Sequence, residues 1–77
     1  MITKFVGRTL SEIRGEVGTG NGQGIAVFQL QDDKDEVGKC IDEQYSLNLI
    51  LKNYPELAEL KVKYANFFYG MWVFRVI

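Results

Sequence analysis

The C-terminal segment, residues 71–77, constrains the fold more than any other part of the chain, because it predicts a strand that is apolar on both faces. Successive residues of a strand point to opposite sides. One side would carry Met71, Val73 and Ile77, and the other Trp72, Phe74 and Val76, with Arg75 as the only charged residue. An antiparallel strand with one face in water alternates between apolar and polar residues. We therefore expect this strand to be covered on both faces.

The strongest turn signal is Asn21-Gly22, a pair that is typical of a two-residue type I′ hairpin turn. A hairpin closed on this turn would pair residues 12–17 with residues 26–31. The pairing gives one apolar face and one mostly polar face, as a half-buried antiparallel pair requires. The sequence thus favours a hairpin over residues 12–31.

The first half of that hairpin has an alternative interpretation as a short helix from residue 10 to residue 17. Thr9 and Glu12 have the spacing of a capping box, and apolar residues follow at helical intervals. Gly15 would weaken such a helix by about 1 kcal/mol relative to alanine. We prefer the hairpin and keep the helix as the alternative.

Charge and spacing predict one main helix in the middle of the chain. Four carboxylates between residues 32 and 36 favour a helix start, where the macrodipole is positive, and apolar residues follow at helical spacing. We expect this helix to run from about residue 34 to residue 53, and Pro55 to begin a short helical segment that ends near residue 60. Strand-like alternation follows from residue 60, a turn is expected between residues 66 and 70, and residues 2–6 fit a short N-terminal strand.

These elements predict a single α+β domain that spans residues 1–77, with a small antiparallel sheet of four to five strands and one main helix packed on one face. One helix covers only one face of such a sheet, so the other face needs a second cover. Three covers are considered: the helical segment 55–60, a partner protein or second copy of the chain, and an apolar ligand that fills a pocket.

Composition argues against several classes of partner. The 77 residues carry a net charge of −1 with a pI near 5.3, so we expect no nucleic-acid partner, because nucleic-acid-binding domains usually present a basic face. We also expect no membrane association, because the apolar runs are far shorter than the roughly 20 residues that cross a bilayer and the N-terminus does not resemble a signal peptide. Cys40 is the only cysteine, which favours a reducing, cytoplasmic location.

The sequence also lacks the residue types that most catalytic and metal sites need. It contains no histidine, so Cys40 and the serines have no imidazole base and a zinc site is not expected. Residues 33–38 resemble the start of an EF-hand loop, but Val37 and Gln44 occupy positions where calcium ligands are needed. We therefore expect no enzyme activity, no metal and no cofactor.

The leading functional hypothesis is a small protein-interaction module that acts by stoichiometric binding, as a homo-oligomer, an adaptor or an inhibitor of a larger protein. Six of the ten aromatic residues lie between residues 64 and 74, and aromatic residues are enriched at interface cores. The expected anchors of this interface are Phe68, Tyr69, Trp72 and Phe74.

The alternative hypothesis is a small-ligand-binding domain in which the glycine-rich residues 18–24 close over an anionic or nucleotide-like molecule. The backbone N–H groups of Gly20, Gly22 and Gly24 would bind the anion, with Lys4 or Arg8 as charge partners. The glycine spacing matches neither the dinucleotide fingerprint nor the P-loop.

Overall fold

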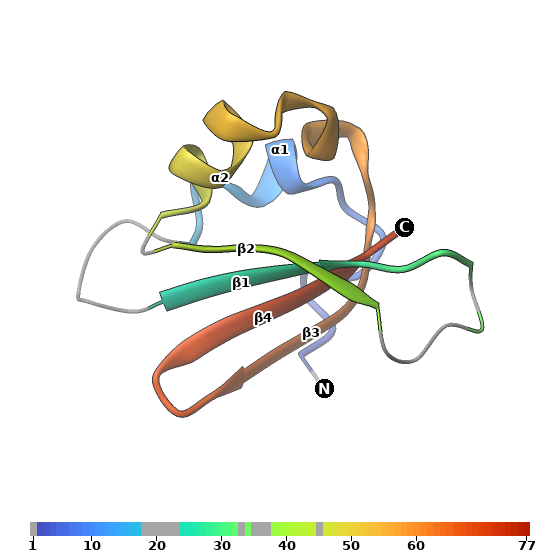
Figure 1. Ribbon diagram of the computed structural model, residues 1–77. Helices are drawn as coiled ribbons and strands as arrows, with labels where there is room; N and C mark the ends of the chain where they lie inside the picture. Colours follow the sequence, from blue (N-terminus) through green and yellow to red (C-terminus); the bar gives the residue numbers. More distant parts are fainter. Residues whose placement is uncertain (1, 18–23, 33, 35–37, 45) are drawn as a thin grey trace.

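Four strands and three short helical segments make up the part of the chain that the computed structural model describes, which is residues 2–17, 24–32, 34, 38–44 and 46–77. The elements, in chain order, are α1 (Leu10–Ile13), β1 (Gly24–Gln29), β2 (Lys39–Gln44), α2 (Leu47–Asn53), the 3₁₀ helix η1 (Pro55–Glu59), β3 (Val62–Phe68) and β4 (Met71–Val76). The strands form one sheet, and the helical segments lie together on one of its faces (Figure 1). The predicted α+β class is confirmed.

The strand order in the sheet is β2-β1-β4-β3. The pairs β1–β2 and β3–β4 are antiparallel, whereas β1 and β4 at the centre are parallel. The sheet is therefore mixed rather than wholly antiparallel as predicted. Parallel neighbours need a long crossover connection, and here β2, α2, η1 and β3 all lie between β1 and β4 in the chain.

The β3–β4 hairpin follows the prediction closely. Tyr69 and Gly70 connect the strands with φ angles of 53° and 71°, so both central residues adopt the left-handed conformation of a type I′ turn. The turn lies within the predicted interval 66–70, and β4 occupies six of the seven predicted positions of the C-terminal strand.

Residues 10–13 form a helix, which is the first part of the alternative over residues 10–17, and the predicted hairpin over residues 12–31 is wrong. The Thr9 hydroxyl accepts a hydrogen bond from the Glu12 amide at 3.2 Å, and the Glu12 carboxylate accepts one from the Thr9 amide at 3.4 Å. This capping box starts α1, which buries Leu10 and Ile13. The turn pair Asn21-Gly22 lies outside the described residues.

The predicted main helix is shorter than expected, because residues 39–44 form β2. Because residues 10–13 are helical and residues 14–17 form no strand, β1 has no hairpin partner on that side, and β2 pairs with it instead. Helix α2 begins only after Ser46, whose hydroxyl accepts from the Asn48 amide at 3.2 Å. It ends at Asn53, before the predicted restart at Pro55, which η1 confirms.

Residues 2–6 do not form the predicted strand, although they lie along the outer edge of β3. The Ile2 amide donates to the Ala65 carbonyl at 2.8 Å and the Gly7 amide donates to the Val62 carbonyl at 2.8 Å. The chain turns over residues 4–7 and directs Phe5 into the core. The turn ends at Gly7, which has a φ of 85°. A flat strand would not bring Phe5 to that position.

The hydrophobic core lies between the helical segments and one face of the sheet. The sheet contributes Ile25 and Val27 from β1 and Phe74 and Val76 from β4. Phe5 packs edge-on against Trp72 and Phe74, with ring centroids 5.3 and 5.7 Å apart. The other face of the sheet takes no part in this core, and we call it the helix-free face.

Candidate functional site

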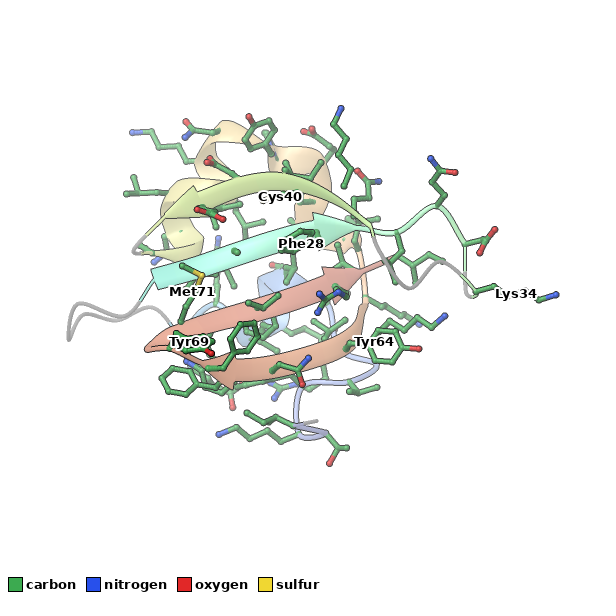
Figure 2. All side chains as sticks on the ribbon, turned by 60° about the horizontal axis from the view of Figure 1, so that its bottom comes forward. Phe28, Lys34, Cys40, Tyr64, Tyr69 and Met71 are labelled. Carbon is green, nitrogen blue, oxygen red and sulfur yellow. The ribbon has the colours of Figure 1, made fainter. Side chains whose placement is uncertain are left out.

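The helix-free face has no helix or strand of the described chain over it. Of the three covers considered, the segment after Pro55 does not cover this face, because η1 lies with α1 and α2 on the opposite side and buries Leu57 in the core (Figure 1). Figure 2 looks onto the helix-free face and shows Phe28, Cys40, Tyr64 and Met71 on it. This face is the candidate site because a sheet face with apolar residues needs a cover.

Strand pairing arranges the side chains of this face in three rows that cross the sheet. The middle row is Glu43, Ala26, Val73 and Asn66; one flanking row is Cys40, Phe28, Arg75 and Tyr64; the other is Gly24, Met71 and Phe68. The two central residues of the middle row, Ala26 and Val73, have short side chains, whereas both flanking rows contain long side chains. The face therefore has small apolar residues at its centre and aromatic residues around them.

The centre of the face is closed to water by side chains of the face itself. Ala26 and Val73 are only 1% and 4% exposed, although no described element lies over them. The half-buried side chains of Phe28 and Met71 flank them. Met71 also lies across Gly24, because a Cβ at position 24 would be 3.2 Å from the Met71 Cε atom. This arrangement reduces the apolar area in contact with water without removing it.

The four predicted anchors do not form one surface. Phe68 is 48% exposed and belongs to the helix-free face, and Tyr69, in the adjoining turn, is 99% exposed. Their rings meet edge-on at 5.6 Å. Trp72 instead points to the helix side, where it is half-buried against the core, and Phe74 is completely buried. Phe74 is therefore a core residue and offers no surface to a partner.

Two cations lie on aromatic rings at one end of the β3–β4 half of the sheet. The Arg75 guanidinium carbon lies 5.2 Å from the centroid of the Phe28 ring, and the Lys63 Nζ atom lies 5.6 Å from that of Tyr64. The exposed carboxylate Glu43 belongs to the edge strand β2 on the other side of the sheet. The face thus has a cationic side and an acidic edge.

Sequence reasoning missed Phe28, Tyr64 and Ala26 as members of this face. The alternation of side chains along a strand indicates which residues share a face. This signal was sufficient to predict the two faces of β4, but not those of β1 or β3. For β1 the wrong pairing partner hid it, and for β3 a bulge between Val62 and Tyr64 interrupts the alternation. Only knowledge of which strands are neighbours brings these residues together.

Cys40 lies on the helix-free face but is a weak nucleophile. Burial raises the pKa of its thiol, and the nearby carboxylates of Glu43 and Asp42 raise the pKa further. The reactive species of a cysteine is the thiolate, so a raised pKa leaves little of it at neutral pH. Cys40 therefore behaves as a small side chain of the surface.

The residues of the alternative ligand hypothesis are only partly within the described chain. Gly20 and Gly22 lie outside it, and Gly24 is the first residue of β1. Of the two proposed charge partners, Lys4 lies over the Phe5 ring at 5.0 Å and Arg8 forms ion pairs with Glu12 and Glu16. Within the described chain, both proposed charge partners therefore contact other side chains.

A surface pocket of about 380 Å³ lies at the end of β1 that leads into residues 30 and 31. It is lined by Gln29, Leu30, Gln31, Lys39 and Ile41. None of these residues belongs to the three rows of the helix-free face, so this pocket is a separate feature.

The described residues offer neither a metal site nor a membrane-spanning helix. Within that part of the chain, no three His, Cys, Asp or Glu side chains are placed so that they could hold a metal ion. None of the helices there has the length and apolar character needed to span a bilayer. Most of the EF-hand-like run, Asp33 and residues 35–37, lies outside the description.

Comparison with known proteins adds no further information on the site. No protein-family model, no curated protein and no solved structure matches this chain. The function is therefore argued from the geometry of the helix-free face.

Proposed function

We propose that this protein is a small interaction module that binds another protein through the helix-free face of its sheet. The observation that carries the proposal is a sheet face over which no described element lies, and on which the exposed Phe68 and the half-buried Phe28 and Met71 are open to solvent. Exposed apolar surfaces of this kind are typical of protein interfaces. Binding would be stoichiometric rather than catalytic, with the protein acting as a homo-oligomer, an adaptor or an inhibitor.

The shape and charge of the face favour a protein over other partners. Small ligands usually bind in concave sites that enclose most of their surface, whereas this face is one side of an open sheet. Nucleic acids need a basic surface, whereas the chain has a net charge of −1 and Glu43 lies in the middle row of the face. A protein surface can match both the apolar centre and the mixed charges.

The proposed anchors of the interface are the exposed and half-exposed aromatic residues, together with one methionine, that lie on or beside this face. Phe68 and Tyr69 are retained from the sequence-based set, and Phe28, Tyr64 and Met71 join them. Aromatic residues and methionine are enriched at interface cores because they bury a large apolar area. The interaction is placed in the cytoplasm, where Cys40 would remain reduced.

A matched pair of variants tests the proposal. Phe68 and Leu49 are 48% and 47% exposed, but Phe68 is on the helix-free face and Leu49 is on α2, on the opposite side of the molecule. Phe68→Asp should abolish capture of the partner from extracts of the source cells, whereas Leu49→Asp should leave it unchanged. Quantitative mass spectrometry of the captured proteins measures both effects.

The proposal fails if both variants retain the same partners as the wild-type protein, or if loss follows Leu49→Asp instead. It also fails if the wild-type protein captures nothing above background and remains a monomer by light scattering at every concentration. Thermal melts of both variants confirm that any loss of capture is not caused by unfolding.

A further inference from the structure

We infer that the partner of the helix-free face is an acidic protein segment, and that Arg75 binds a carboxylate of that segment. This inference rests on the proposed function and adds the chemistry of the partner. It assigns to Arg75 the role of a specificity determinant, with the half-buried side chains of Phe28 and Met71 receiving a neighbouring apolar side chain of the same segment.

Arg75 is the only arginine or lysine in the three rows of the face. The register places it between Phe28 on β1 and Tyr64 on β3, and its guanidinium lies over the Phe28 ring. An arginine stacked on an aromatic ring keeps its planar group in a fixed orientation. The cation is therefore held in place before a partner arrives.

Within the described residues, one donor of this cation lacks an acceptor. The Arg75 Nε atom is buried and has no hydrogen-bond partner, and the ion pairs within the described chain involve Arg8 rather than Arg75. A buried donor without an acceptor destabilises the free protein, so its presence in a structure calls for an explanation. A carboxylate from a partner would supply the missing acceptor and the missing counter-charge.

Arg75 lies on the helix-free face and is not fully buried. The Arg75 side chain as a whole is only half-buried, although its Nε atom is shielded. A carboxylate would bind through the terminal nitrogens, and a small rotation of the guanidinium would let Nε join a two-bond contact. Such paired contacts between arginine and carboxylate are among the strongest hydrogen bonds in proteins.

One carboxylate gives the partner a direction. Arg75 lies on β4 beside β3, whereas Glu43 lies across the sheet on β2. The acidic group of the partner is therefore placed over β3 and β4, away from Glu43. A nucleic-acid backbone, which carries a phosphate at every nucleotide, would bring negative charge close to Glu43 and is disfavoured for that reason.

An unbiased selection tests this chemistry. A random-peptide display library is selected on the immobilised wild-type protein and, in parallel, on Arg75→Gln. The wild-type selection should enrich peptides with an aspartate or glutamate beside apolar residues. The Arg75→Gln selection should lose that enrichment. Arg14→Gln is the matched control, because Arg14 is exposed at the end of α1 on the helix side and should leave the enrichment intact.

The strongest selected peptide is then compared with its amide counterpart, in which asparagine or glutamine replaces the acid. In NMR titrations the acidic peptide should shift the Arg75 Nε–H signal and the amides of Phe28 and Val73. It should bind at least about tenfold more tightly than the amide version, and Arg75→Gln should remove that difference. Arg75→Lys, which retains the charge without the planar group, should give an intermediate affinity.

Each result separates this inference from the proposed function. Peptides that bind the helix-free face without an acidic preference would overturn the role of Arg75 and leave the interaction module standing. Peptides that bind elsewhere, or no selected peptides at all, would overturn both. Tighter binding of a uridine oligonucleotide than of the acidic peptide to the same face would also overturn the inference. A thermal melt of Arg75→Gln that matches the wild-type protein confirms that the variant is folded.

Discussion

At the scale of single residues, neighbours in the sequence have opposite roles at the C-terminal hairpin. Trp72 packs against Phe5, Phe67 and Phe74 on the helix side, with ring centroids between 5.1 and 5.7 Å apart. Tyr69, three residues earlier, is almost completely exposed. Both are aromatic residues of the kind found at interfaces, so residue type alone does not separate a core aromatic from a surface one.

This difference predicts opposite effects of truncation on stability. Trp72→Ala should lower the free energy of unfolding by about 2–4 kcal/mol, because it removes a large side chain that packs on the core. Tyr69→Ala should leave it within about 0.5 kcal/mol, because the side chain contacts mostly water. Urea denaturation of the two variants measures both values. Equal stability losses would show that the hairpin is packed differently.

The ion pair between Arg8 and Glu16 predicts a pH dependence at the acid end. The hydrogen bond from Arg8 lowers the pKa of Glu16 below its ordinary value of 4.5. The pair therefore contributes its full stability above pH 4.5 and loses it as the pH falls through the lower pKa of the folded protein. The contribution is small, because both groups are near the surface.

A comparison of variants isolates this contribution. The wild-type protein should melt at a higher temperature than Glu16→Gln near neutral pH, and the two should converge well below pH 4.5. Glu59→Gln, an exposed residue of η1, is the matched control and should show no such convergence. A difference between the wild-type protein and Glu16→Gln that persists unchanged in acid would contradict the assignment.

At the scale of elements, the close approach of Gly38 to β1 fixes the start of β2. A Cβ at position 38 would lie 2.6 Å from the Gln29 carbonyl oxygen and 2.7 Å from a Leu30 methyl carbon. Gly38→Ala should therefore destabilise the protein by about 1–3 kcal/mol, as overpacked sites do. Gly15→Ala, where a Cβ would meet nothing within 4 Å, should be neutral or slightly stabilising. Thermal melts that rank the two variants in the reverse order would place β2 differently.

Elements that depend on local sequence signals could be predicted from the sequence, whereas elements that depend on a distant partner could not. The β3–β4 hairpin and the restart at Pro55 were predictable, because turn and proline signals act locally. The β1–β2 pairing was not, since the same stretch fits a helix when read alone and becomes a strand only because β1 needs a neighbour. The capping box at Thr9 was recognised, but the Asn21-Gly22 signal outweighed it.

At the scale of the whole molecule, 77 residues provide one core and one layer of helices, which cover a single face of the sheet. From the two-faced character of β4, the sequence predicted that a second cover would be needed and that Trp72 and Val73 point to opposite faces. It did not predict that Trp72 and Phe74 point to the core, because the direction of the core depends on Phe5 and α1, which pack against β4 from a distant part of the chain.

The measurement that tests this account most directly is photo-cross-linking inside the source cells. A photoreactive phenylalanine analogue replaces Phe68 in one sample and Leu49 in another, because the two positions are equally exposed on opposite sides of the molecule. The account predicts a discrete protein adduct, with a partner or a second copy of the chain, from position 68 and none from position 49. Adducts from position 49 alone, or the same adducts from both positions, would contradict the claim that the helix-free face is the interaction surface.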